Sequence, residues 1–156
     1  MLTTAFGGYF GSRLMQNIRE RKGYTYGIDA SLPGLGCDRF LRVSTECDAA
    51  YVEAVIAEVR SEMERLRREP LPAEELNAVK QFLLGERAKM LDHPFSQASL
   101  VAMVVNGRFP SDHFNRMCGA VVGVTPERLL SLARQYFRPE QLRVVVATGT
   151  DGDPTA

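Results

Sequence analysis

A cluster of glycines limits the beginning of the chain to short segments joined by tight turns. The glycine-dense entry over residues 6–11 is followed by a stretch of helical periodicity, for which Ser12 is a suitable N-cap. We expect this helix to end near Arg21, because Gly23 stands where a C-cap glycine is commonly found. A short helix and a sharp turn therefore precede any strand.

Two β-type segments follow the turn. Over residues 24–32, Tyr26, Ile28 and Ala30 alternate with small or polar residues, and this period of two predicts a half-buried strand. The segment 39–46 is also rich in β-forming residues, and a glycine- and proline-containing turn separates the two. We expect the pair to form an antiparallel hairpin with a long connection.

Helical periodicity dominates the middle of the chain. Asp48 is a suitable N-cap for a long helix whose apolar residues recur at spacings of three and four: Val52, Val55, Ile56, Val59, Met63 and Leu66. The other face of this helix is predicted to be solvated, and it carries the mixed charges of Glu58, Glu62, Arg65, Arg68 and Glu69. Further helices are predicted from Ala73 to about Leu91, over residues 96–106 and 112–122, and from the Thr125-Pro126 start to about Phe137.

The end of the chain completes the predicted fold class. Residues 141–149 are predicted to form a buried strand, and residues 150–156 a disordered tail. The chain is therefore expected to fold as one α+β domain over residues 1–149, an antiparallel sheet with helices packed on one face. The sheet is small for this much helix, so we expect part of it to lie outside this sequence or to come from a partner.

The composition excludes some classes of function. The 19 basic and 19 acidic residues cancel, so no net charge favours binding to nucleic acid or to anionic lipid. No apolar run approaches the roughly 20 residues of a membrane span, and the start lacks the basic region of a signal peptide. Periplasm and cytoplasm both remain open as compartments.

The cysteines do not form a metal or redox motif. Cys37, Cys47 and Cys118 share no C-x-x-C spacing, and ordinary free thiols are the simplest interpretation. Cys37 and Cys47 flank a predicted strand, so a bridge between them in an oxidising compartment is the alternative.

The beginning of the chain resembles the second-half signature of the pitrilysin family of zinc peptidases, which includes insulin-degrading enzyme and mitochondrial processing peptidase. The family run G-G-x-x-x-S-R-L-x-x-x-I/L-R-E-x-x-G-x-x-Y is matched in register by Gly7, Gly8, Ser12, Arg13, Leu14, Ile18, Arg19, Glu20, Gly23 and Tyr26. Later segments also resemble the family, so the likeness covers nearly the whole chain. It implies a fold like that of mitochondrial processing peptidase, incomplete at its N-terminus.

The resemblance also implies that this chain is the metal-free half of the peptidase. Hydrolysis in the family needs an H-x-x-E-H motif and a downstream glutamate, and this chain has only His93 and His113, which have no partner histidine at helical spacing. We therefore expect that this chain contains no catalytic residue and binds no zinc, and that it is inactive on its own. The expected partners are a zinc-bearing half, in the same longer chain or in a heterodimer, and an extended peptide substrate.

Two residues carry the expected substrate contacts. Arg19 and Tyr26 match an arginine and a tyrosine that, in the family, reach substrate held at the other half's zinc. A guanidinium can hydrogen-bond a peptide carbonyl, and a phenol can donate to a developing oxyanion. Without the resemblance, Arg19 is a charge balancing a helix dipole and Tyr26 a strand aromatic.

The other motif residues are expected to have structural roles. Gly7 and Gly8 are expected to permit a tight entry to the helix, and Ser12 to act as a cap, since no base is placed to activate it as a nucleophile. For Arg13 two interpretations stay open, an ion pair that ties the helix start to the sheet or a position facing the substrate chamber.

One alternative function comes from a different class. A structural or assembly protein that retains the peptidase fold after losing proteolysis would share most of this sequence pattern. Intact Arg19 and Tyr26 favour the peptidase interpretation, because a scaffold does not need them.

Overall fold

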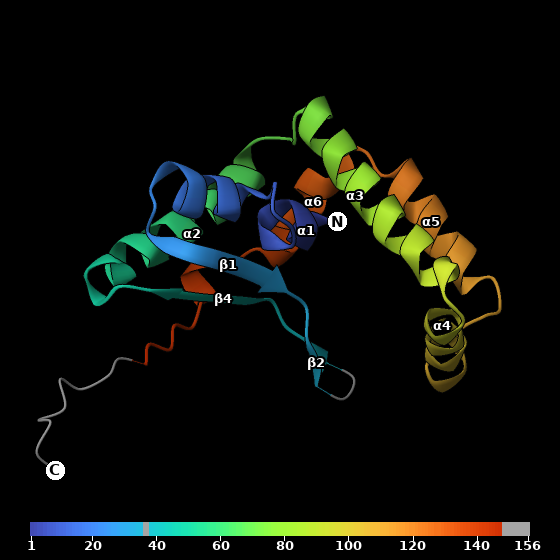
Figure 1. Cartoon of the computed structure of the whole chain (residues 1–156). Coiled ribbons are helices and arrows are strands. Elements are labelled where there is room, and N and C mark those ends of the chain that lie inside the picture. Colours follow the sequence, from blue (N-terminus) through green and yellow to red (C-terminus); the bar gives the residue numbers. More distant parts are fainter. Residues whose placement is uncertain (36–37, 148–156) are drawn as a thin grey trace, which may run out of the picture.

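A computed structural model describes residues 1–35 and 38–147 of the chain. Figure 1 shows a two-stranded antiparallel sheet, formed by β1 and β4, with helices above it and a helical arm to one side. The elements that build the sheet and its cover are α1 (Leu2–Gly7), the π-helix η1 (Met15–Arg21), β1 (Thr25–Ser31), β2 (Gly34–Leu35), β3 (Asp38–Arg39), β4 (Arg42–Cys47), η2 (Ala49–Tyr51) and α2 (Val52–Arg68). The remaining elements are α3 (Ala73–Asp92), α4 (Pro94–Asn106), α5 (His113–Gly123), α6 (Pro126–Tyr136) and η3 (Pro139–Gln141).

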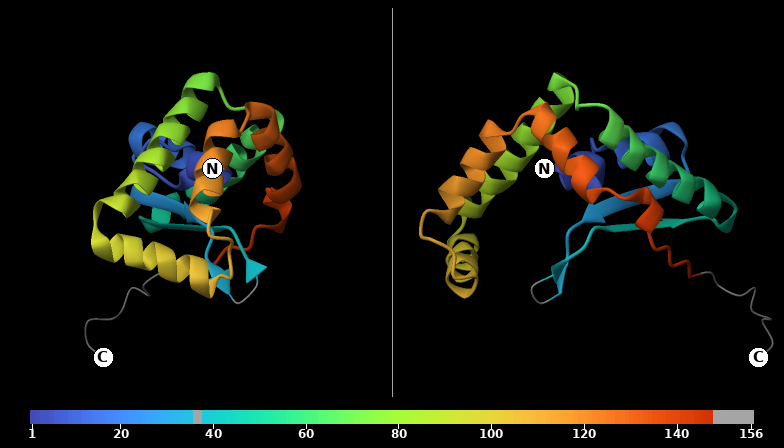
Figure 2. Two further views of the ribbon diagram at one scale, coloured as in Figure 1. Left: turned by 90° about the vertical axis from the view of Figure 1, so that its right-hand side faces the viewer. Right: turned by 180° about the vertical axis from the view of Figure 1, so that it is seen from behind.

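The predicted fold class is confirmed. The helices α1, η1, α2 and α6 pack on one face of the β1–β4 sheet, as both views of Figure 2 show, while α4 and α5 pack against α3 to form the arm. The small β2–β3 pair extends the connection between β1 and β4. No helix among the described residues is long and apolar enough to cross a bilayer.

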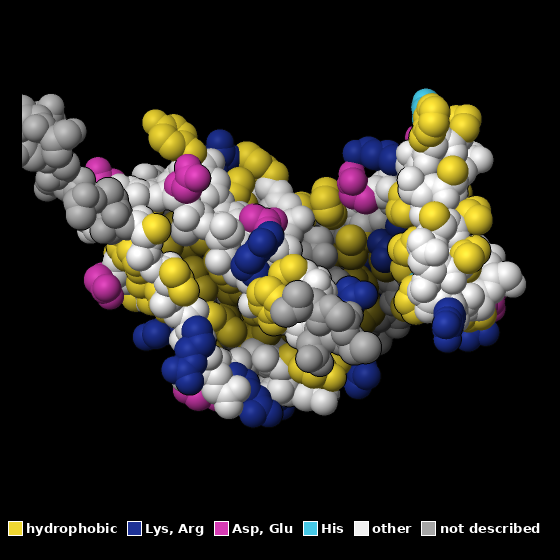
Figure 3. Space-filling model, turned by 90° about the horizontal axis from the view of Figure 1, so that it is seen from below, with side chains coloured by type: hydrophobic (Ala, Val, Ile, Leu, Met, Phe, Trp, Pro, Cys, Tyr) yellow, Lys and Arg dark blue, Asp and Glu magenta, His cyan; other side chains and the backbone are white. Residues whose placement is uncertain are grey.

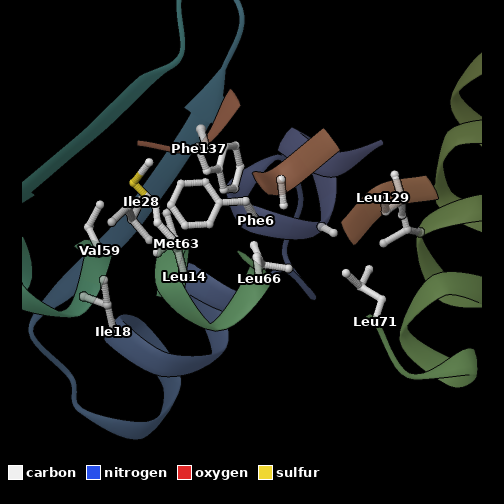
Figure 4. Close-up of a cluster of buried hydrophobic side chains, with 14 of the residues drawn as sticks. Phe6, Leu14, Ile18, Ile28, Val59, Met63, Leu66, Leu71, Leu129 and Phe137 are labelled. Atoms are coloured by element: carbon white, nitrogen blue, oxygen red, sulfur yellow. The ribbon is translucent and has the colours of Figure 1, made fainter. Parts of the chain in front are cut away.

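The hydrophobic core lies between the sheet and its covering helices (Figure 4). The rings of Phe6 and Phe137 meet at 5.0 Å between centroids, joining α1 to the residue that follows α6. Each fully buried side chain of this size contributes about 1.5–3 kcal/mol to folding. The core residues that the figure labels are Phe6, Leu14, Ile18, Ile28, Val59, Met63, Leu66, Leu71, Leu129 and Phe137.

Gly7 allows α1 to lie directly against the sheet. A Cβ at Gly7 would come within 2.6 Å of the Cβ of Ala30 on β1 and 3.0 Å of Leu14 Cδ1. A Cβ at Gly8 would come within 2.8 Å of the Cα of Thr4. A side chain at Gly7 would therefore push α1 away from the sheet, and one at Gly8 would clash with the backbone of α1 itself.

Most of the helix predictions are confirmed within one to three residues. The side chain of Thr125 accepts a hydrogen bond from the Arg128 N–H (3.2 Å), as expected of the N-cap of α6. The Asp48 carboxylate accepts from the Ala50 N–H (2.9 Å), and it caps the short η2, which runs on into α2. Helix α1 was not predicted, because the glycines that follow it hid its short apolar pattern.

Two expectations for individual side chains are wrong. Ser12 is buried, and its hydroxyl caps nothing, because the helix that follows has no side-chain cap and Oγ lacks a hydrogen-bond partner. Glu62 is only 2% exposed rather than solvated. Its Oε1 accepts from the Asn17 amide (2.9 Å) and from Arg65 Nη1 (2.9 Å), so η1 covers this part of the charged face of α2.

The predicted last strand is also wrong over its described part. Residues 142–147 form no strand, and Val145 is 94% exposed, with Val144 and Val146 exposed beside it. A buried strand needs paired neighbours, and among the described residues β1 and β4 pair only with each other. Residues 148 and 149 of that prediction, the tail at 150–156 and Cys37 lie outside the described part. Cys47 and Cys118 are free thiols.

A bidentate ion pair joins the arm to the segment between α1 and η1. Arg13 donates through Nε (2.8 Å) and Nη2 (2.9 Å) to the two carboxylate oxygens of Glu75 on α3, and the rings of Tyr9 and Phe82 stack nearby at 4.9 Å. Of the two interpretations of Arg13, the ion pair is therefore the one found, and it ties the helix start to α3 rather than to the sheet.

We predict that Arg13→Ala lowers the free energy of unfolding by about 1–3 kcal/mol, because it leaves the partly buried Glu75 carboxylate without its partner. Arg116→Ala is the matched control. It removes an exposed pair with Asp112 on the surface of α5 and should cost at most about 0.5 kcal/mol. Urea denaturation of both variants measures the difference, and equal values would contradict the proposed role of the Arg13–Glu75 pair.

Candidate functional site

The candidate site is built on the turn from η1 into β1. Gly23 adopts a φ of +66°, which favours glycine, and its N–H donates to the carbonyl of Arg19 (3.0 Å). The Tyr24 N–H donates to the carbonyl of Ile18 (3.0 Å). These bonds close the end of the helix and direct the chain straight into the strand, as the C-cap position of Gly23 predicted.

Arg19 lies in the π-helical segment that precedes this turn. Its Nη1 donates to Glu20 Oε1 (2.6 Å), and its guanidinium carbon lies 4.9 Å from the centroid of the Phe10 ring. A guanidinium over an aromatic face is held by a cation–π attraction that leaves its N–H groups at the rim available. Arg19 is thus only partly covered, and both of its contacts are on the protein surface.

Tyr26 lies on β1 at a β-bulge. Thr25 pairs with Cys47 and Ile28 pairs with Thr45, so two residues of β1, Tyr26 and Gly27, stand opposite one residue of β4. The extra residue changes which side chains of β1 face the core on the two sides of the bulge. Ile28 and Ala30 point into the core as predicted, but the Tyr26 side chain is 99% exposed.

The simple alternation predicted from the sequence is therefore wrong at this point. A regular strand would place Tyr26 on the same face as Ile28, and it would place Thr25 on the other. In the structure Thr25 is buried and Tyr26 points away from the core. A tyrosine that buries almost none of its surface contributes little to folding, and its ring is accessible from solvent.

Two threonines hydrogen-bond to the peptide groups of the bulge. Thr25 Oγ1 lies 3.1 Å from the Gly27 nitrogen and 2.6 Å from the carbonyl oxygen of Glu46. Thr45 Oγ1 lies 2.9 Å from the carbonyl oxygen of Gly27. Sequence reasoning missed both threonines, because their role depends on strand pairing that local periodicity does not encode.

Gly27 leaves open space beside Tyr26. A Cβ at this position would meet nothing within 4 Å, and Gly27 is not at a positive φ. Neither packing nor backbone conformation therefore requires a glycine here. Its effect is to leave the main chain uncovered, as at places where another backbone approaches a strand closely.

A shallow depression of about 650 Å³ adjoins Tyr26. Figure 3 shows the molecule from below, with the arm separated from the body by a notch. The depression is lined by Met15 of η1 and by residues of the two strands: Tyr26, Gly27, Ile28, Asp29, Arg42, Ser44, Thr45 and Glu46. Arg19 does not line this depression, and no hydrogen bond or cation–π pair joins Arg19 to Tyr26 among the described residues.

The residues present do not fit a zinc ion. Within residues 1–35 and 38–147, no group of three or more His, Cys, Asp or Glu side chains is arranged to hold a metal. His93 accepts a hydrogen bond from the Phe95 N–H (3.2 Å) at the start of α4, and His113 stacks on Phe109 at 4.1 Å. Both histidines therefore have local roles on the arm.

Comparison with known proteins identifies relatives of this chain. The family model described as the peptidase M16 inactive domain matches residues 1–83, which is more than half of the sequence. No curated protein matches the chain.

Solved structures share the fold. A peptidase M16 inactive domain from Pseudomonas fluorescens is similar with a TM-score of 0.80 and 17% identity, over 89% of this chain and 33% of that one. A protease from Helicobacter pylori is similar with a TM-score of 0.78 and 18% identity, over 90% of this chain and 34% of that one. A conserved protein from Enterococcus faecalis is similar with a TM-score of 0.72 and 21% identity, over 86% of this chain and 31% of that one. The chain thus spans about a third of the length of each.

Proposed function

The chain belongs to the peptidase M16 inactive-domain family, and from that premise we propose that it is the substrate-binding, non-catalytic half of a zinc-dependent endopeptidase. The zinc-bearing half, in the same longer chain or in a partner subunit, would supply the metal-activated water that attacks the peptide. This chain would complete the chamber and hold the substrate.

The observation that carries the proposal is the exposure of the Tyr26 side chain. Its phenol projects from the bulge with 99% of the side chain exposed, at the edge of an open depression on the sheet. A phenol held outward in this way can donate a hydrogen bond to the oxygen of a scissile carbonyl as negative charge develops on it. Water is a competitor until the other half of the chamber excludes it.

Arg19 is proposed to bind the substrate main chain. Its guanidinium is fixed on one side by the ring of Phe10 and paired with the exposed carboxylate of Glu20. Such an exposed pair is weak, so a peptide carbonyl can replace Glu20 at small cost. The guanidinium can then donate its N–H groups to the oxygen of a peptide carbonyl.

The proposed substrate is an extended, unstructured peptide. The bare main chain of Gly27 lets a peptide lie close against the sheet, and the outer edges of the two strands offer backbone groups to it in the manner of strand addition. Charged and hydroxyl side chains around the depression, such as Asp29, Ser44 and Thr45, can bind the main chain of a peptide.

We predict that Tyr26→Phe lowers kcat of the complete protease by about a hundredfold, because one donor to the developing oxyanion is lost. Arg19→Ala should raise KM about tenfold, because a charge-assisted contact with the substrate is lost. Hydrolysis of fluorescein-labelled casein by the chain assembled with its zinc-bearing half measures both effects. Tyr136→Phe and Arg60→Ala, at exposed positions on α6 and α2, are the matched controls and should leave kcat and KM unchanged.

Unchanged hydrolysis in both the Arg19 and the Tyr26 variants would overturn the proposal. If instead the assembled protein neither binds zinc nor cleaves casein, the chain is better described as a structural protein that retains the peptidase fold.

Gly27→Ala tests the approach of the substrate backbone. Space for the methyl group is available, so the variant should be as stable as the parent or up to about 1 kcal/mol more stable. Binding of labelled casein should nevertheless weaken several-fold, because the methyl group stands between the strand and the incoming peptide. Gly85→Ala on α3, where a Cβ would also meet nothing, is the control and should leave binding unchanged. Equal casein binding by the two variants would contradict a close backbone approach at Gly27.

A further inference from the structure

The peptide groups of the β-bulge need hydrogen-bond partners outside the regular ladder. An extra residue in one strand interrupts the ladder, so peptide groups at the bulge bond to side chains or to water instead. The groups concerned are the N–H and carbonyl of Gly27 on β1 and the carbonyl of Glu46 on β4. Each of these groups lies within hydrogen-bond distance of a threonine hydroxyl.

One arrangement of hydrogens that agrees with the distances gives each of these three peptide groups a partner. Thr25 Oγ1 can donate to the Glu46 carbonyl oxygen (2.6 Å) or to the Gly27 carbonyl oxygen (2.9 Å), and we assign its proton to the nearer one, Glu46. The same oxygen accepts from the Gly27 N–H (3.1 Å). Thr45 Oγ1 then donates to the Gly27 carbonyl (2.9 Å), and the two hydroxyls lie 2.9 Å apart. Two hydroxyls thereby satisfy all three peptide groups. We call this pair, Thr25 and Thr45, the threonine clasp.

The clasp fixes the backbone on both sides of Tyr26. The residue before it, Thr25, is buried and bonded across to β4, and the residue after it, Gly27, is bonded to both threonines. The ring itself touches little and remains exposed. A strand that lost the extra residue would slip by one position, and that slip would turn Tyr26 onto the face of Ile28.

We propose that Thr25 and Thr45 are positioning residues that hold Tyr26 in the outward orientation needed to contact substrate. The proposal rests on the substrate-binding role proposed above for Tyr26. Both threonines act on Tyr26 through the main chain that carries it. A small misplacement of a donor is enough to reduce a rate strongly, so loss of the clasp should resemble partial loss of Tyr26.

Valine is a suitable replacement for testing the clasp. It keeps the branched shape of threonine and its preference for strands, and it removes only the hydroxyl group from the side chain. Thr25→Val and Thr45→Val should therefore fold. Thr25→Ser keeps the hydroxyl and serves as the conservative control.

The experiment measures casein hydrolysis by the complete protease together with amide hydrogen exchange at Gly27. We expect Thr25→Val to lower kcat about tenfold or more with little change in KM, and Thr25→Ser to restore most of it. In a Tyr26→Ala background, Thr25→Val should have no further effect, because the clasp acts only through Tyr26. The Gly27 amide should be protected from exchange in the parent and should lose that protection in Thr25→Val.

Full activity of both valine variants, or an equal further loss in the Tyr26→Ala background, would overturn the positioning role. An unprotected Gly27 amide in the parent protein would overturn the clasp itself. If Tyr26→Ala alone leaves hydrolysis unchanged, the substrate-binding role of Tyr26 fails and the positioning role fails with it, while Gly27 exchange still decides whether the clasp exists.

Discussion

The burial of Ile18 and Ile28 in one core is the constraint on which the candidate site depends. Ile18 belongs to η1 and Ile28 to β1, and both side chains are almost completely covered. The chain between them must therefore turn within a few residues, which Gly23 permits through its positive φ. Arg19 follows one anchor directly and Tyr26 precedes the other by two residues. Both candidate contact residues are thus held next to rigid positions while they remain accessible.

The helical part of the fold is well predicted from the sequence, because long apolar periods and caps act locally. The start of α6 at Thr125 is an example, since one side chain and its neighbours determine it. The last strand fails for the opposite reason. The apolar residues around Val145 have the composition of a buried strand, but a strand forms only beside a partner, and no described residues pair with this segment. Burial of Glu62 likewise depends on contact between η1 and α2, which no local pattern reveals.

The candidate site shows the same division between local and non-local information. The motif that contains Arg19 and Tyr26 can be found in the sequence, and so can the turn at Gly23. The orientation of Tyr26 cannot be found from periodicity, because it depends on an extra residue in β1 and on hydroxyl groups from two strands. Periodicity placed Tyr26 with the core residues, and the bulge places it in solvent. Departures of this kind from local pattern are expected where a structure serves binding rather than stability.

The most direct test of a substrate-binding role is a photochemical crosslink from position 26 in the complete protease. Benzoylphenylalanine in place of Tyr26 should, on irradiation, form a covalent adduct with fluorescein-labelled casein. An excess of unlabelled casein should suppress the adduct. The same photoreactive group in place of Tyr136, exposed on α6, should give no adduct. Equal crosslinking from both positions, or none from position 26 in an assembly that cleaves casein, would contradict the account.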